Sequence, residues 1–428
     1  MRAVPAPPGS RHPTDAASLR DPDARRLIGA VASLNVLSYV DRQLLVALAP
    51  LLMADLGLSR AQIGLLVGVS FIAVFALGTL VVGALADRWH RPRLIALGLG
   101  VWSAATALTS LASGMASLAA CRALVGIGEA ALPPTALSML GDRIPFKSMG
   151  LASGVFYAGI PVGFGLSFAL AGLVGPWLGW RVCFLGLGTA GLAASLLVLR
   201  LPDPLRRGTA PAASGPRGGA RETWRAVTER PSILVLIGAG ALLAYASASS
   251  QHAITWLVEE RGFDFSRAAF WSAIVITTAG LAGNLAIGAI TDRARRRHPA
   301  GRALALAVVS VAGLGAAAAF YRLPPASPRF LPSWFVAQAF LLGWYGSLLA
   351  AIDERAPAGQ RATLIGGALL IVNLAGVATG PFVTGYVGDR AGLTYALLSS
   401  LVPGLAGAAL LALLGLRELR SPRRPVGS

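Results

Sequence analysis

The sequence predicts an all-α integral membrane protein with twelve transmembrane helices arranged in two six-helix bundles. Three observations predict this class: the composition, the number of long apolar runs, and an internal repeat that divides the chain into halves. Of 428 residues, 55% are hydrophobic and only 13% are charged, and the mean hydropathy is +0.66. Soluble domains carry roughly 25% charged residues, so the composition alone indicates a membrane protein.

Twelve apolar runs are long enough to cross a bilayer, because a spanning helix needs about 20 mostly apolar residues. They cover approximately residues 27 to 53, 61 to 86, 93 to 113, 116 to 140, 148 to 175, 180 to 199, 231 to 258, 267 to 290, 302 to 320, 331 to 351, 361 to 387 and 393 to 416.

These runs define five segments of the chain. A charged stretch rich in Pro, Gly, Ala and Ser separates the sixth run from the seventh, which is typical of a flexible linker. The predicted segments are an N-terminal tail (1–26), a first bundle (27–199), the linker (200–230), a second bundle (231–417) and a C-terminal tail (418–428).

The positive charges predict the orientation in the membrane, because Lys and Arg concentrate in the loops on the cytoplasmic side. When the termini and the linker are placed on one side, that side holds 28 Lys and Arg residues and the other side holds 7. We therefore expect a multi-pass protein of the cell inner membrane with both termini in the cytoplasm. The net charge of +18 follows from this bias and does not indicate a nucleic-acid partner.

A short motif recurs at an offset of 205 residues and supports two related halves. Each copy closes the second span of its half, and repeated halves are how many transporters build two bundles around a central site. The copies are Gly83-Ala-Leu-Ala-Asp87-Arg88 and Gly288-Ala-Ile-Thr-Asp292-Arg293. Together with Arg91 and Arg93, they are candidates for a charged gating latch between the bundles, or for simple control of topology.

Four charged residues lie unusually deep in the predicted membrane. Of 19 acidic residues, only Asp41 in the first span and Glu129 in the fourth fall near the middle of a span, and Arg42 and Arg122 accompany them. Intramembrane charges are costly, so they usually pair, face a cavity and mark an ion or substrate path. Arg122 and Glu129 are seven residues apart, which places both on one face of a helix.

This pattern suggests a proton-coupled anion site. Burial disfavours the charged form of a carboxyl group, whereas a neighbouring guanidinium favours it, and a site that opens alternately to two sides could change that balance. We expect Asp41 and Glu129 to bind protons and thereby free Arg42 and Arg122 for an anionic substrate. The alternative is a static salt-bridge network that fixes helix packing.

The remaining polar residues give weaker signals. The spans of the second half carry aromatic and amide residues but no clear intramembrane charge except the ambiguous His252, which predicts an aromatic, apolar wall opposite the charges. Cys121 and Cys183 lie in apolar runs without metal spacing. We predict no catalytic residue, no cofactor and no metal.

Several motifs resemble a known family. The loop from Gly83 to Arg93 resembles the signature loop of the major facilitator superfamily. Three stretches of the first half are similar to Spinster-type lipid transporters, which include sphingosine-1-phosphate exporters: residues 38–42, residues 122–130, and residues 156–166 with their Phe-Tyr-Ala-Gly-Ile-Pro pattern.

The resemblance implies a major facilitator fold and assigns roles to specific positions. Asp41 and Glu129 match proton-linked acids of the family, and Arg42 and Arg122 match headgroup-contacting arginines. Asn35, Phe156, Phe168 and, in the tenth span, Trp344 fall where the family lines its substrate cavity. Phe168 stands where a tyrosine is usual, and the second half matches weakly.

These observations predict a secondary transporter that works by alternating access, is coupled to protons, and moves an amphipathic anion such as a lysophospholipid. The expected partners are that small molecule or lipid, protons and the bilayer, and we expect a monomer. Multidrug efflux or organic-anion transport is the alternative within the same class. An intramembrane lipid-modifying enzyme and a substrate sensor are alternatives from other classes.

Overall fold

The computed structural model describes residues 21–86, 89–204, 225, 229–356 and 361–420. Within these ranges the chain is all-α, and no strand occurs. Most of the predicted N-terminal tail (1–20), much of the linker (205–224 and 226–228) and the last eight residues (421–428) lie outside the described ranges, as do Asp87 and Arg88 of the first repeat motif.

The first half runs from α1 to α8. Its elements are α1 (Pro22–Ala47), α2 (Ala49–Leu56), α3 (Arg60–Val67), the π-helix η1 (Val69–Ala73), α4 (Val74–Ala86), α5 (Arg91–Thr109), α6 (Met115–Glu129), α7 (Leu132–Arg143) and α8 (Phe146–Val198).

The second half runs from α10 to α18. Its elements are α10 (Pro231–Ser249), the short 3-10 helix η2 (Ser250–His252), α11 (Ala253–Glu259), α12 (Phe265–Arg297), α13 (Gly301–Arg322), α14 (Phe330–Gly343), α15 (Tyr345–Asp353), α16 (Arg361–Val372), the π-helix η3 (Asn373–Val377), α17 (Thr379–Ala391) and α18 (Leu393–Arg420).

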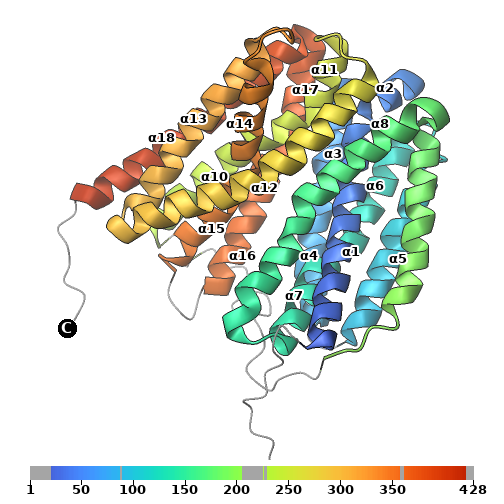
Figure 1. The fold of residues 1–428 in the computed structure, drawn as a ribbon, viewed down its shortest axis with the longest axis horizontal. Helices are drawn as coiled ribbons and strands as arrows, with labels where there is room; N and C mark the ends of the chain where they lie inside the picture. The colour runs from blue at the N-terminus through green and yellow to red at the C-terminus, as the bar shows by residue number, and fades with distance from the viewer. Residues whose placement is uncertain (1–20, 87–88, 205–224, 226–228, 357–360, 421–428) are drawn as a thin grey trace, which may run out of the picture.

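The predicted count of twelve crossings is confirmed. Nine continuous helices in the described ranges are long and apolar enough to cross a membrane, and the bent pair α1 and α2 makes a tenth. The long helix α8 supplies two crossings, because the chain reverses direction at Gly179, whose φ of +79° favours glycine. The 19-residue α5, packed between α6 and α8, completes the set. Figure 1 shows the reversal of α8.

Helix boundaries follow local capping signals more closely than hydropathy. α1 begins at Pro22, five residues before the first apolar run, because the Asp21 side chain accepts a hydrogen bond from Asp23 N at 3.1 Å and Pro22 occupies the first helical position. α18 extends to Arg420, which is beyond the apolar run. Hydropathy detects the membrane-embedded part of a helix but not its polar ends.

The two halves meet mainly along two helix pairs: α8 with α12, which Figure 1 shows side by side, and α3 with α17. Small residues allow these helices to approach closely, as is common in membranes, where apolar lipid gives little hydrophobic drive for helix association. A Cβ on Gly64 of α3 would lie 2.2 Å from the Pro381 carbonyl oxygen, and one on Gly385 of α17 would lie 2.3 Å from the Arg60 carbonyl oxygen. Glycine is therefore required at both positions.

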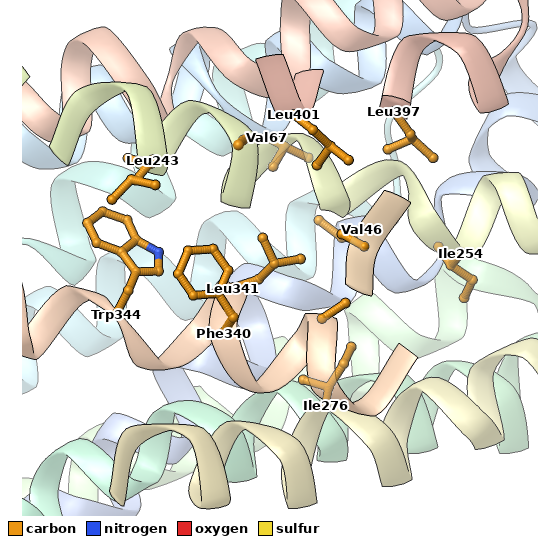
Figure 2. Packing of buried hydrophobic residues seen from close by; sticks show 14 of the residues in the cluster. Val46, Val67, Leu243, Ile254, Ile276, Phe340, Leu341, Trp344, Leu397 and Leu401 are labelled. Atoms are coloured by element: carbon orange, nitrogen blue, oxygen red, sulfur yellow. The ribbon is translucent and has the colours of Figure 1, made fainter. Parts of the chain in front are cut away.

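The apolar core crosses the boundary between the halves. One large cluster of buried residues includes Val46 and Val67 of the first half together with Leu243, Ile276 and Leu401 of the second. Figure 2 shows these side chains together. A second cluster of buried apolar residues gathers mainly around α1, α5 and α7 of the first half. The four intramembrane charges lie among these packed helices.

Candidate functional site

The four intramembrane charges converge at one place in the first half. Asp41 and Arg42 lie near the end of α1, and Arg122 and Glu129 lie on α6. Asp41, Arg122 and Glu129 are each at most 2% exposed, whereas 16% of the Arg42 side chain is accessible. Two positive and two negative side chains compensate one another, as buried charges require. We call these four residues the charge cluster.

The ion pairs run between the two helices. Arg42 donates to Glu129 Oε2 from Nη2 at 2.7 Å and from Nε at 3.2 Å, and Ser38 Oγ donates to the same oxygen at 2.9 Å. Arg122 Nη1 lies 3.9 Å from Asp41 Oδ1, which is a looser pair. Each acid of one helix therefore faces an arginine of the other, and one pair is tight while the other is loose.

Both guanidinium groups lie over aromatic rings. The Arg42 guanidinium carbon is 4.6 Å from the ring centres of Tyr39 and Phe75 and 4.7 Å from that of Phe71, and the Arg122 carbon is 4.6 Å from the Phe71 centre. Phe71 belongs to η1, and π-helical turns occur frequently at functional sites. The ring faces stabilise both cations without neutralising them.

Two donors of Arg122 stay available. Nε and Nη2 are buried and have no hydrogen-bond partner among the described residues, and the same is true of Glu129 Oε1. A guanidinium presents its donors in a planar fork that matches carboxylate and phosphate groups. Arg122 is therefore the cluster residue that is best prepared to bind an anionic group.

Polar and aromatic side chains of both halves lie near the charge cluster. Tyr345 of α15 interacts with the Asn373 side chain of η3 and lies close to Tyr39 and Tyr157 of the first half. Tyr39 also contacts the Arg42 guanidinium. The second half therefore presents hydroxyl and amide groups as well as aromatic rings to this region.

The cavity positions implied by the family resemblance have structural partners. Asn35 Nδ2 donates to the Phe156 carbonyl oxygen at 2.7 Å, and Phe156 packs edge-on against Tyr157 with ring centres 5.2 Å apart. Phe168 is buried in the large apolar cluster. Trp344 Nε1 donates to Ser247 Oγ at 2.9 Å, and Figure 2 shows its ring beside Leu243 and Phe340. All four side chains are at least 96% buried.

The described gating candidates make contacts inside their own halves. Arg91 is 1% exposed and donates to Asp142 at 2.5 Å and to Asp203 at 2.7 Å, which ties α5 to α7 and to the start of the linker. Asp292 pairs with Arg302 at 2.8 Å. Gly83 is half-buried with open space beside its Cα, and Arg93 and Arg293 are exposed. Asp87 and Arg88 lie outside the described residues.

At the opposite end of the helix bundle, an ion pair and several hydrogen bonds join the two halves. Arg60 donates to Glu259 Oε2 from Nη2 at 2.6 Å and to the Gly388 carbonyl oxygen from Nη1 at 2.8 Å. Asp389 accepts from the backbone N–H groups of Arg60 and Ala61, both at 2.9 Å. We call these five residues the seal. Nothing in the sequence marks these residues, because charges at helix ends are common.

Ionisable groups near the seal also stabilise helix ends. The Glu260 carboxylate accepts hydrogen bonds from Leu393 N, Thr394 N and Thr394 Oγ1 at the start of α18. Partial burial acts to raise the pKa of Glu260, but these hydrogen bonds, together with the charge of Arg60, hold the pKa below its ordinary value. Glu260 therefore stays ionised next to the seal.

In the described part of the chain, no group of three or more His, Cys, Asp or Glu side chains is placed to hold a metal ion. The two cysteines are free. His252, the ambiguous histidine of the sequence, is buried, and its Nε2 lies 2.7 Å from the Pro381 carbonyl oxygen. This contact links α10 and η2 to α17.

The chain matches the Major Facilitator Superfamily over residues 31–377, which is most of its length, and it belongs to that superfamily. The family and the fold are those of multi-pass membrane transporters of the secondary type. A crystal structure of a bacterial homologue of the human lysosomal transporter Spinster, in an inward-facing and unoccupied conformation, is similar with a TM-score of 0.83 and 22% identity. It covers 95% of this chain and 99% of the other.

Curated relatives differ in how much of this chain they cover. An MFS-type efflux pump of Mycolicibacterium smegmatis is 27% identical over 365 residues, which are 85% of this chain and 84% of the pump. Protein spinster of Drosophila melanogaster is 31% identical over 173 residues, which are 40% of this chain and 28% of the fly protein. The predicted resemblance to the superfamily and to Spinster proteins is therefore confirmed.

Proposed function

We propose that this protein moves an amphipathic anion, such as a lysophospholipid, across the cell inner membrane in exchange for or together with protons. Arg122 and Arg42 bind the anionic headgroup, and Asp41 and Glu129 carry the protons. The observation that carries the proposal is the charge cluster itself, in which a buried guanidinium keeps two donors that no described residue accepts from.

The loose pair supplies a coupling mechanism. Because Arg122 Nη1 lies 3.9 Å from Asp41 Oδ1, protonation of Asp41 removes an attraction without breaking a tight hydrogen bond. The freed Arg122 then offers its fork to a phosphate or carboxylate group. Deprotonation restores the attraction and favours release of the anion. Glu129, held by Arg42 and Ser38, is the second acid of the cycle.

The seal defines one state of an alternating-access cycle. Among the described residues, the ion pair and the shortest hydrogen bonds between the halves gather at the Arg60 end. The predicted orientation, with both termini in the cytoplasm, makes this the extracellular end. The conformation is then inward-facing, as is that of the similar Spinster homologue.

Flux of a labelled lysophospholipid into proteoliposomes, driven by a pH gradient, tests the proposal. We expect flux in the wild type and at least a tenfold loss in Glu129→Gln and in Arg122→Ala, since charge-assisted bonds contribute about 1.5–3 kcal/mol. Arg322→Ala, which alters an exposed arginine, serves as the matched control. Absence of flux in folded wild-type protein contradicts the lipid substrate.

A smaller organic anion, or a drug moved by efflux, is the second candidate. Two observations favour it: the efflux-pump relative matches along most of this chain, and Tyr345 and Asn373 present polar groups near the arginines. Competition separates the candidates, because soluble carboxylates or drugs that block uptake more strongly than lysophospholipids would identify the smaller substrate.

A further inference from the structure

A hydroxyl group completes the environment of Asp41. Thr106 of α5 donates a hydrogen bond from Oγ1 to Asp41 Oδ2, and its oxygen also lies 2.9 Å from the Trp102 carbonyl oxygen one helical turn earlier. Thr106 is 1% exposed, so water does not compete for it. The same hydroxyl therefore reaches two acceptors inside the protein.

Close helix packing brings Thr106 to this place. α5 and α6 cross where Gly98 faces Gly128: a Cβ on Gly98 would lie 2.6 Å from the Gly128 carbonyl oxygen, and a Cβ on Gly128 would lie 2.7 Å from Trp102 N. The crossing brings α5 against the helix that carries Arg122 and Glu129. Thr106, two turns beyond Gly98, then reaches Asp41 of α1.

A hydroxyl has one proton to donate and can accept in return. When Asp41 is ionised, the Thr106 proton points to Asp41 Oδ2. When Asp41 is protonated, the carboxyl O–H donates to Thr106 Oγ1, and the Thr106 proton turns to the Trp102 carbonyl oxygen, which has a second lone pair. Asp41 Oδ2 and Thr106 Oγ1 therefore stay hydrogen-bonded to each other in either state.

We propose that Thr106 is a positioning residue that sets the pH at which Asp41 takes up its proton and thereby releases Arg122. The other charged groups that face Asp41 are Arg42 of α1 and Arg122 and Glu129 of α6. This inference rests on the proposed proton coupling and adds to it a residue from a third helix. It does not depend on which anion is transported.

The direction of the effect follows from hydrogen-bond chemistry. A hydrogen bond to a carboxylate is roughly twice as strong as one between neutral groups, so Thr106 stabilises ionised Asp41 more than protonated Asp41. Removing the hydroxyl should shift the midpoint of Asp41 protonation to higher pH by about one unit. Arg122 would then be released at a higher pH than in the wild type.

Thr109 provides a matched control on the same helix. It is 1% exposed like Thr106, and its Oγ1 donates to the Ala105 carbonyl oxygen at 2.9 Å, but no carboxylate of the described ranges pairs with it. Thr106→Val and Thr109→Val remove the same group from equally buried sites. Only the first is expected to alter Asp41, whereas Thr106→Ser is expected to restore the wild-type behaviour.

A pH titration of the full-length protein in liposomes tests this proposal. Infrared difference spectra are recorded at each pH, and no transport substrate is added. The C=O stretch of protonated Asp41 is identified as the band lost in Asp41→Asn. We expect its midpoint to rise in Thr106→Val and to stay unchanged in Thr109→Val and Thr106→Ser. Thr106→Ala replaces Thr106→Val if the latter does not fold.

Two results would overturn the proposal: an unchanged midpoint in Thr106→Val, or wild-type protein without any Asp41-dependent band. Flux measurements are separate from this readout. A wild type that transports no lysophospholipid but shows the shifted band in Thr106→Val would contradict the proposed substrate and keep the role of Thr106. Normal flux with an unshifted band would contradict the role of Thr106 alone.

Discussion

The Asp389 carboxylate, near the end of α17, caps the N-terminus of α3 in the opposite half by accepting from Arg60 N and Ala61 N, both at 2.9 Å. The first N–H groups of a helix have no partner within the helix, and the positive end of its dipole favours an anion. Ser59 satisfies a further N–H of the same turn, that of Gln62, at 3.2 Å. A helix start in one half is thus completed by a side chain of the other.

Asp389→Asn should therefore weaken the seal. Asparagine keeps one acceptor oxygen but loses the charge, and hydrogen bonds to charged groups contribute about 1.5–3 kcal/mol, so a loss of about 1.5 kcal/mol is expected. That loss favours the state open at the Arg60 end by roughly tenfold. Distances between spin labels at Ser113 and Ala326, two exposed positions in loops of opposite halves at this end, report the change.

Asp264→Asn is the matched control for this experiment. Asp264 lies at the same end and also caps a helix with its carboxylate, accepting from Arg267 N at 3.3 Å, but it does so within the second half. Its replacement should leave the spin-label distances unchanged. A population of longer distances in Asp264→Asn, or none in Asp389→Asn, would show that the seal does not hold the halves together.

The pairing between α1 and α6 makes a prediction about energetic coupling. Removing one member of a buried ion pair costs about 3–5 kcal/mol because the other charge stays buried, so the double change should cost less than the sum of the single changes. For Arg42→Met and Glu129→Gln, we expect a coupling energy of about 3 kcal/mol in the free energy of unfolding. Chemical denaturation in detergent measures it.

The second ion pair of the charge cluster serves as an internal comparison. Arg122 and Asp41 lie 3.9 Å apart and should couple less strongly than Arg42 and Glu129 at 2.7 Å. Equal coupling energies for the two pairs would mean that the tight and loose arrangement does not persist in the protein. Additive effects for Arg42 and Glu129 would contradict the pairing itself.

The fold and the four intramembrane charges could be predicted from the sequence, because placing a charged group inside a bilayer costs much free energy. Long apolar runs and the few charges inside them are therefore easy to recognise in the sequence. The pairing of charges between α1 and α6 could not be predicted, because a sequence contains positions along each helix but not the rotation of one helix relative to another. The spacing of seven positions from Arg122 to Glu129 predicts that both lie on one face of α6, and only the structure shows that this face meets Asp41 and Arg42.

Other contacts left no distinctive signal in the sequence. Phe71 and Thr106 are ordinary residues for a membrane helix, so nothing marks them as partners of the charge cluster. Asn35 illustrates a different case: the family resemblance implies a cavity position for it, and the structure adds a hydrogen bond from its side chain to the backbone of α8. A buried amide satisfies its hydrogen bonds wherever a carbonyl is within reach.

Phe71 should matter more than its neighbour Phe75, because its ring faces both arginines whereas Phe75 faces Arg42 alone. A buried cation–π contact contributes about 1–2 kcal/mol. Phe71→Leu should therefore weaken anion binding by roughly tenfold or more, and Phe75→Leu by a smaller factor. Titration of a lysophospholipid, followed by the thermal shift of the purified protein, measures both affinities.

Leucine keeps each site apolar and similar in size, so these variants separate the ring face from simple packing. Leu66, a fully buried residue of α3, offers a control: Leu66→Met changes packing near η1 without removing an aromatic ring. Equal weakening by all three changes would indicate a packing effect and contradict the stacking role of Phe71.

Glu260 gives the stability of the protein a predictable pH dependence. Its pKa in the folded protein lies below the ordinary value of 4.5, because hydrogen bonds from Thr394 and Leu393 outweigh the effect of partial burial. A carboxyl group with a lowered folded-state pKa stabilises the fold above its unfolded pKa, and this contribution is lost as the pH falls through the folded value. We expect Glu260→Gln to cost about 1 kcal/mol at neutral pH, since solvent screens a half-exposed carboxylate.

The melting temperatures of wild type and Glu260→Gln, compared from neutral pH down to below the ordinary value of Glu, check this expectation. Their difference should be largest at neutral pH and should shrink on acidification, because protonation removes the same charge that the substitution removes. Glu229→Gln, at an exposed glutamate paired with Arg225, should match the wild type throughout. A difference for Glu260→Gln that stays constant with pH would mean that the cost arises from lost packing at the start of α18 and not from the ionised carboxylate.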